Sequence, residues 1–220
     1  MTQINSASNE EGSRGLATCS LRRACLTDVQ QLVVLSRICF PQTWPWYAPM
    51  WYLLPLWTAI LRSKAAETYL ALLENRPVGF AVLVVNEPLW NAERKFRHGS
   101  YVRRACAVSQ RPLHGLRLAL KRLRLAMSAR LSTSQAPELS RLCDDRVFLG
   151  TLGVMPDLRR HGIARALMEL RENRAKELCR SLAWGMTDIG NTPAERFLTT
   201  YGYRCVRNSR LGTTWERILT

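Results

Sequence analysis

Several features are missing from this 220-residue sequence, and each absence narrows the classes of protein that remain. Its seven cysteines form no C-x-x-C pair and have no metal-ligand spacing with its three histidines, so we expect no metal site. No apolar run reaches membrane-spanning length without a proline, so we expect no transmembrane helix. The nucleotide-binding patterns G-x-x-x-x-G-K-[ST] and G-x-G-x-x-G are both absent, which excludes the loops that they form.

A signal peptide is also not recognisable, and the cysteine count is odd. Several cysteines lie in apolar surroundings, which indicates free thiols in a reducing compartment, so we expect a cytoplasmic protein. Hydrophobic residues make up 47% of the chain, enough for a full core, and the length fits one domain. The polar residues 1–17 are expected to form a disordered leader.

Acidic residues are missing from the segment between Arg94 and Pro137, which contains eleven lysines and arginines. Leucines recur at helical spacing from Leu113 to Leu131, with the basic residues mostly off that stripe. One interpretation is a surface helix whose charges are solvated. The other is that residues 94–130 face an anion, such as the phosphates of a cofactor, an acidic acceptor or an anionic lipid surface. No recognised binding module accompanies the charge, so we expect no nucleic-acid partner.

The first half of the chain alternates between strand and helix patterns. A strand-like run after Thr18 precedes a helix that Thr27 or Asp28 would cap. Two further strand-like runs, at residues 68–73 and 78–85, are separated by a hairpin signal. These patterns predict a strand, a helix and then a two-stranded hairpin.

Residues 40–61 lie between that helix and the hairpin, and they contain four of the seven tryptophans and four prolines. The prolines exclude one long helix, so we expect a loop and then a short helix from about Pro49. Packing of the aromatic rings in the core or a lid is the interpretation that we favour. Docking at a membrane interface is the weaker alternative.

The most informative stretch begins at Val147. An apolar run from there to Val154 has the length and composition of a buried strand, and Pro156 ends it. From Ile163 to Leu178 apolar residues recur at helical spacing, with arginine and glutamate between them. The unit is therefore a strand, a basic glycine-containing turn and an amphipathic helix.

The turn of this unit suits a diphosphate. The first amides of a helix have no intrahelical partner, and the aligned peptide dipoles make that end partly positive. Gly162 lets the backbone come close to a ligand, and Ala164 keeps the approach open. Arg159, Arg160 and His161 add positive charge. The sequence therefore predicts a pyrophosphate-binding cradle at the start of the helix.

Two motifs in this region carry a resemblance to a known family. The pattern V-x-P-x-x-R-x-x-G-x-A, which ends in Gly162-Ile163-Ala164, resembles the coenzyme A-binding motif [RQ]-x-x-G-x-[GA] of the GNAT acetyltransferases. A second strand-like run at residues 184–188 is followed by residues close to the family pattern N-x-x-A-x-x-F-Y-x-x-x-G-[FY]. These are Asn191, Ala194, Phe197, Gly202 and Tyr203. The resemblance is good from Val147 to Thr220 and schematic before that, and an ordinary strand–turn–helix with a basic cap is the plainer alternative.

The resemblance implies an α/β (α+β) fold with a GNAT-like mixed, largely antiparallel sheet of six to seven strands flanked by helices. One such domain would cover residues 18–220. Between its third and fourth strands, where a minimal member of the family turns directly into the next strand, residues 86–146 would form a basic helical insertion.

The resemblance also implies acetyl-CoA as a co-substrate, without a metal. The strand backbone would bond the pantetheine amides and polarise the thioester, and the cradle would hold the diphosphate. The implied cofactor-binding residues are Leu152, Gly153, Val154, Arg159, Arg160, His161, Gly162, Ile163, Ala164 and Asn191.

Acetyl transfer to an amine also needs a proton donor for the leaving thiolate and a base for the amine. The family often places a tyrosine acid where this chain has Leu198, so Tyr201, on a neighbouring part of the same helical face, is the candidate acid. Its more ordinary role would be packing near Gly202. The strand from Val147 carries no carboxylate, where the family often keeps its base, and Asp188 is the candidate base. Asp144 and Asp145 are the reserve candidates for that base.

Together these features predict an N-acetyltransferase that moves an acetyl group from acetyl-CoA to a primary amine of a small molecule, such as an amino sugar or an amino acid. Transfer would be direct, within a ternary complex. One alternative is a non-catalytic acyl-CoA-binding or regulatory module, which the leucine at 198 favours. The other is a transferase of longer acyl chains, which the aromatic residues 40–61 favour, because in this fold they border the acceptor pocket.

Overall fold

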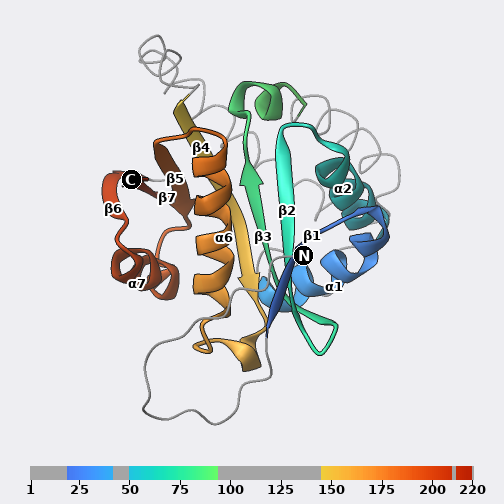
Figure 1. The fold of residues 1–220 in the computed structure, drawn as a ribbon. Helices are drawn as coiled ribbons and strands as arrows, with labels where there is room; N and C mark the ends of the chain where they lie inside the picture. The colour runs from blue at the N-terminus through green and yellow to red at the C-terminus, as the bar shows by residue number, and fades with distance from the viewer. Residues whose placement is uncertain (1–18, 42–49, 94–144, 210–211, 220) are drawn as a thin grey trace, which may run out of the picture.

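A computed structural model describes residues 19–41, 50–93, 145–209 and 212–219 of the chain. They form one seven-stranded sheet with helices on both faces, and α6 crosses in front of the sheet in Figure 1. The strands are β1 (Ser20–Arg23), β2 (Ala66–Leu73), β3 (Arg76–Val84), β4 (Arg146–Val154), β5 (Leu182–Thr187), β6 (Arg204–Ser209) and β7 (Gly212–Ile218). The helices are η1 (Leu26–Asp28), α1 (Val29–Cys39), α2 (Met50–Arg62), η4 (Pro156–Leu158), α6 (Ile163–Glu177) and α7 (Thr192–Tyr201). A further helical segment at 87–93 follows β3.

The strand order is β1-β2-β3-β4-β5-β7-β6, and every neighbouring pair is antiparallel except β4 and β5. This confirms the predicted mixed, largely antiparallel sheet and sets its size at seven strands. The predicted insertion does fall between β3 and β4, but residues 94–144 lie outside the described residues, as do residues 1–18. The helical character of the basic insertion, its contact with an anion and the disordered leader therefore stay predictions.

Most predicted elements of the first half are confirmed, with bounds shifted by two residues or fewer. The hairpin strands occur as β2 and β3, and the short helix expected from about Pro49 begins at Met50. Pro55 lies inside this helix, where it removes one intrahelical hydrogen bond without ending the helix. Trp57 is buried and its ring meets that of Phe80 edge-on at 5.2 Å between centroids, so this tryptophan is a core residue.

The two faces of the sheet carry two separate cores, because successive side chains of a strand point to opposite faces. The first core lies under α6 and α7 and draws Tyr69 and Ala71 from β2. The second lies under α1 and α2 and draws Leu70 and Leu72 from the same strand. Burial on both faces explains why β2 and β3 are nearly continuous apolar runs.

The parallel pair of β4 and β5 is short. Its partners run from Arg146 with Leu182 to Leu149 with Gly185, and no further pairs follow. Yet β4 continues to Val154 and β5 to Thr187. The two strands therefore part in their second halves, at the edge of the sheet where both have their carboxyl ends.

Helix α1 packs directly on the free half of β4. A Cβ on Gly153 would lie 2.9 Å from ring carbons of Phe40 and Phe80 and 3.0 Å from the Cβ of Cys39. Real Cβ contacts are almost never so short, so this approach of α1 to the strand requires glycine.

We expect Gly153→Ala to lower the free energy of unfolding by about 1–3 kcal/mol, because the added methyl group overpacks the contact between α1 and β4. Urea denaturation measures this loss. The exposed Thr200→Ala on α7 is the control and should change stability by less than about 0.5 kcal/mol. Equal stability of the two variants would contradict the packing described here.

The residue before α1, Asp28, lies at the predicted cap position, but its side chain bonds elsewhere. Both carboxylate oxygens accept hydrogen bonds from the guanidinium of Arg22 at 2.7 Å, and Oδ2 also accepts from the backbone N–H of Cys25 at 2.8 Å. The guanidinium of Arg22 holds the pKa of the Asp28 carboxyl to about 2, below its ordinary value of 3.8. Asp28 thus joins β1 to the start of α1.

Because the pKa of Asp28 is lower in the folded chain than in the unfolded one, its stabilisation is present above pH 4 and is lost as the pH falls toward 2. We expect Asp28→Asn to cost about 2 kcal/mol at pH 7, from the difference between the two pKa values. The loss should shrink steadily between pH 4 and pH 2. Urea denaturation of both proteins across this range measures it, and a loss that stays constant with pH would contradict the assignment.

Candidate active site

The turn between β4 and α6 is built by local hydrogen bonds and two left-handed residues. Met155 N–H donates to the carbonyl of Val78 at 2.9 Å, and Leu158 N–H donates to the carbonyl of Met155 at 3.0 Å, which closes η4. Arg160 and Gly162 then adopt positive φ values of 66° and 80°. Together they turn the chain from the end of β4 into α6, and both ends meet at one end of the molecule (Figure 1).

The start of α6 is open. Gly162 is exposed, and a Cβ placed on it would meet nothing within 4 Å. No side chain caps the helix at this residue, and the hydrogen bond from Ala166 N–H to the carbonyl of Gly162, 3.0 Å long, begins the intrahelical series. The preceding amides, at residues 163–165, therefore face outward without an intrahelical partner. This end of α6 has both the space and the donors to hold an anion.

The arginine of the first motif, Arg159, points back toward the sheet. Its Nε donates to the carbonyl of Val154 at 3.3 Å, and its Nη2 donates to the carbonyl of Cys39 at 3.4 Å. It thereby ties the turn to the end of β4 and to the last turn of α1. The ring of His161 lies on the carbonyl of Arg159, with Nδ1 at 2.9 Å from the oxygen, and the side chains of Arg159, Arg160 and His161 are exposed.

Cys39, whose carbonyl contacts Arg159 of this turn, is not suited to act as a catalytic thiol. Burial raises the pKa of Cys39 to about 11, although the charge of Arg159 opposes the shift. The thiol therefore stays protonated at neutral pH and is a poor nucleophile. Free thiols are also found at Cys19, Cys25, Cys179 and Cys205.

The predicted strand segment 152–154 lies in the half of β4 that has parted from β5. Its backbone groups on that side have lost the neighbouring strand, and polar backbone groups need partners. A ligand with amides of its own can supply them. The strand segment and the turn are continuous in the chain, so the structure does bring together the predicted cofactor-binding residues from Leu152 to Ala164.

Asp188 and Asn191 follow β5 at the same edge of the sheet, because the carboxyl ends of parallel strands share an edge. Asp188 is exposed. The side-chain oxygen of Asn191 accepts a hydrogen bond from the backbone N–H of Ala194 at 3.3 Å and so caps α7. Sequence reasoning missed this capping role, although an asparagine followed by a proline in the first helical turn, here Pro193, is a capping signal.

Tyr201 lies at the other end of α7 from Asn191. The guanidinium of Arg217 sits over its ring at 4.9 Å, and the ring of Tyr203 stacks at 6.2 Å between centroids. Burial, and then the charge of Glu172, raise the pKa of the Tyr201 hydroxyl. Tyr201 is the last residue of α7 and Asp188 lies four residues before its first, so the ten-residue helix separates the two candidate catalytic residues.

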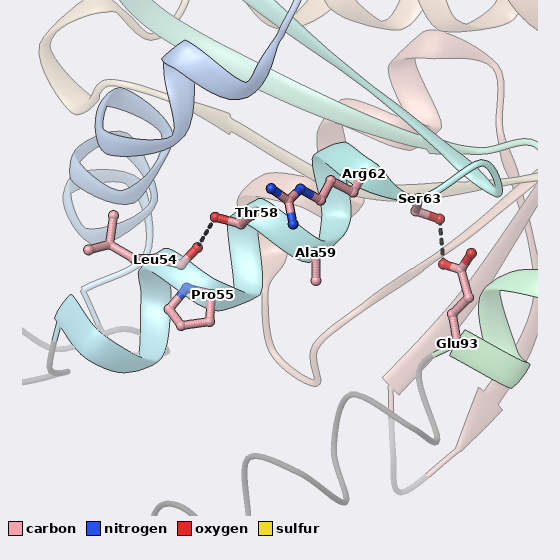
Figure 2. A pocket seen from close by; sticks show the side chains of 7 residues that line it. All are labelled: Leu54, Pro55, Thr58, Ala59, Arg62, Ser63 and Glu93. Atoms are coloured by element: carbon pink, nitrogen blue, oxygen red, sulfur yellow. Dashed lines mark hydrogen bonds between the residues drawn. The ribbon is translucent and has the colours of Figure 1, made fainter.

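A cavity of about 660 Å³ lies elsewhere, against the outer side of α2 (Figure 2). In it the hydroxyl of Ser63 donates to the carboxylate of Glu93 at 2.6 Å. None of the predicted site residues lines this cavity. Its lining residues are Leu54, Pro55, Thr58, Ala59, Arg62, Ser63 and Glu93.

Two further properties concern the part of the chain that the structure describes. None of its helices is long and apolar enough to cross a membrane. Within the same residues, no three His, Cys, Asp or Glu side chains are grouped so that they could hold a metal ion.

The fold and the open helix start define an α+β protein that can hold an anionic group beside a free strand. Comparisons with known proteins show which family this part of the chain is similar to. The sequence profile of the acetyltransferase (GNAT) family matches residues 128–203. No curated protein matches the sequence. The matched stretch is that of the GNAT acetyltransferases, a family of acyl-CoA-dependent N-acetyltransferases that use acetyl-CoA.

Solved acetyltransferase structures share the fold at low sequence identity. An acetyltransferase from Thermus thermophilus has a TM-score of 0.59 at 13% identity, over 93% of this chain and 99% of that one. PaiA N-acetyltransferase from Thermoplasma acidophilum, in complex with coenzyme A, has 0.56 at 12% identity, over 91% and 98%. The ribosomal-protein-S18-alanine N-acetyltransferase from Escherichia coli has 0.55 at 10% identity, over 92% and 94%.

Proposed function

We propose that the enzyme transfers an acetyl group from acetyl-CoA directly to the primary amine of a small molecule, such as an amino sugar or an amino acid, within a ternary complex. The observation that carries the cofactor end of this proposal is the open start of α6. There Gly162 leaves free space beside unpaired helix amides, directly after a strand that has parted from its neighbour.

The diphosphate of the cofactor would lie on the amides of residues 163–165, where the helix dipole favours negative charge. The side chains of Arg160 and His161 are exposed and lie within two residues of Gly162, so they would add positive charge there. Arg159 would keep the turn in place through its carbonyl contacts while its remaining N–H groups face solvent. The two amide hydrogens of Asn191 stay available to the cofactor, because its capping contact uses only the oxygen.

The pantetheine arm would then run along residues 152–154 of β4, into the space from which β5 has diverged. In the transfer step the amine nitrogen bonds to the carbonyl carbon, the carbon–sulfur bond breaks and the amine loses a proton. The thiolate that leaves gains a proton. We propose that the exposed carboxylate of Asp188, at the same edge, accepts the proton of the amine directly or through a water molecule.

Tyr201 is the weaker of the two catalytic candidates. A phenol with a raised pKa is a weak proton donor toward a thiolate, because an ordinary thiol has a pKa of about 8.5. Its ring is also engaged by Arg217 and Tyr203. These contacts favour a packing role, with the proton of the thiolate supplied by solvent.

We also propose that the enzyme works in the cytoplasm. The free thiols at the five described cysteines support a reducing compartment.

Substitution of the open glycine tests the cofactor site. We expect Gly162→Trp to abolish the binding of acetyl-CoA in isothermal titration, because the indole would fill the space beside the helix amides. Gly162→Ala is the matched control: it shares the cost of a positive φ, about 1 kcal/mol, but leaves the space open, so it should bind within a few-fold of wild type. Wild-type affinity in the tryptophan variant would contradict the proposed diphosphate site at the start of α6.

A pair of substitutions separates the catalytic candidates. We expect Asp188→Asn to lower kcat about 10²-fold, a typical loss for a general base, and Tyr201→Phe to keep kcat within about twofold while lowering the melting temperature. Coenzyme A release is followed by chromatography over a panel of amines, with acetyl and longer acyl thioesters as donors. A large loss of kcat in Tyr201→Phe, with wild-type stability, would assign the acid to Tyr201 instead.

A further inference from the structure

The two faces of the sheet are covered to different extents beyond β4. On the face toward α6 and α7, Ala183 of β5 and Trp215 of β7 are buried in the first core. On the other face, the core beneath α1 and α2 takes its buried strand residues from β2 and β3, and none from the described residues of β5, β6 or β7. Helices α1 and α2 lie away from β5 and β7 (Figure 1). The open face, as we call this part of the sheet, is formed by Leu182, Trp184 and Met186 of β5 and by Thr214, Glu216 and Ile218 of β7.

The most exposed residues of the open face are apolar. Met186 has 48% of its surface exposed and Ile218 has 61%. Trp184 is half-buried: its ring packs against that of Phe148 at 4.6 Å between centroids, and the guanidinium of Arg146 lies over it at 5.3 Å. Adjoining apolar side chains that stay exposed on a folded protein often mark a binding site.

The open face extends to the level at which β4 and β5 part. The last pair between these strands is Leu149 with Gly185, and Trp184 comes just before it on β5. Met186 comes just after it, so Met186 is the first residue of β5 without a partner on β4. The exposed apolar side chain of Met186 therefore lies where the gap between the strands begins. Asp188, the proposed base, is two residues further along the chain.

Helix α6 fills the opposite side of the sheet at this level. Leu167 of this helix is fully buried. Nη1 of Arg171 donates to the carbonyl of Val82 at 3.1 Å and to that of Gly150 at 3.2 Å. These carbonyls lie at a β-bulge, where Val82 alone faces two residues of β4. A molecule that approaches the gap between β4 and β5 is thus blocked by α6 on one side, whereas the exposed side chain of Met186 makes the other side accessible.

We propose that the end of the open face at Trp184 and Met186 binds an apolar group of the acceptor, so that the substrate is a primary amine carried by an alkyl or aromatic group. Met186 and Trp184 would be the specificity-determining residues. This inference rests on the proposed function, because it requires the thioester to lie where β5 has parted from β4. An amine whose apolar group lies on Met186 would bring its nitrogen to the gap and near Asp188.

The chemistry of the open face separates the acceptors considered above. An alkyl or aromatic group gains from contact with Met186 and Trp184, because apolar surface is removed from water on both molecules. The hydroxyl groups of an amino sugar would instead lose hydrogen bonds to water against the same side chains. The open face therefore favours an apolar amine over an amino sugar.

Two amines that differ by one ring test this inference. We take the ratio of kcat/KM for 2-phenylethylamine to that for ethylamine, with acetyl-CoA as donor, because a general loss of activity or folding cancels in the ratio. We expect a ratio of at least about 30 in the wild type, and a ratio about fivefold lower in Met186→Ser, whose ring contact is lost. Glucosamine should be a poorer substrate than 2-phenylethylamine, and the affinity of Met186→Ser for coenzyme A should stay within about twofold in titration.

Ile218→Ser is the matched control, because it removes an exposed apolar side chain from the same face at a distance from the gap. Ile218 pairs with Leu182, which is four residues and about 13 Å from Met186 along β5. The control should keep the wild-type ratio and the wild-type affinity for coenzyme A.

Three results would overturn the inference and leave the proposed function intact. They are a wild-type ratio in Met186→Ser, a preference for glucosamine, and binding of acetyl-CoA without acetylation of either apolar amine. A second copy of the chain is the other occupant that the open face could have. In that case both serine variants would convert a dimer to a monomer in analytical ultracentrifugation without changing the ratio. Failure of the wild type to bind acetyl-CoA would overturn the proposed function itself.

Discussion

The separation of β4 from β5 halfway along their length creates the candidate site. Two parallel strands that stay paired to their ends leave no free backbone between them, whereas these strands stop pairing after Leu149 and Gly185. The free half of β4 then leads directly into the turn and the exposed first amides of α6. A strand with unpaired polar groups and a helix start with unpaired amides are thus placed in series, which suits a long ligand with amides in its middle and a diphosphate at one end.

This arrangement needs support, because a strand that is paired on one side only is a weak element. On one face α1 packs against Gly153, where no side chain intervenes, and on the other Arg171 bonds the carbonyls at the bulge. Helix α6 is fixed in its second half by ion pairs from Arg174 to Glu67 and from Glu172 to Arg217, while its first turn carries no cap. Stabilising contacts are therefore gathered away from the end of the helix that must stay open.

The cofactor end of the site and the acceptor end have different origins. Residues that would hold the cofactor come mainly from one continuous stretch, the end of β4 and the start of α6, with Asn191 added from the start of α7. The proposed chemistry at the amine draws instead on a separate segment, because Asp188, the proposed base, follows β5. This difference explains why the cofactor is easier to assign than the catalytic groups or the amine.

Local patterns in the sequence were enough to predict the strand–turn–helix unit, the glycine at its bend, and the hairpin of β2 and β3, because each depends on contacts between residues that are close in the chain. They also placed Asp28 at the start of α1, but not its ion pair with Arg22, which requires β1 to lie beside that helix start. Arg171 shares the buried stripe of α6 with Leu167, a hint that a charge there needs a partner. Its partners lie on β3 and β4, however, and only the packing of α6 on the bulged sheet brings them together. Features that depend on one chain segment and its neighbours could be predicted from the residues. The bulge, the parting of β4 from β5 and the surroundings of Tyr201 arise instead from contacts between segments that are distant in the chain, so they exist only once the chain has folded.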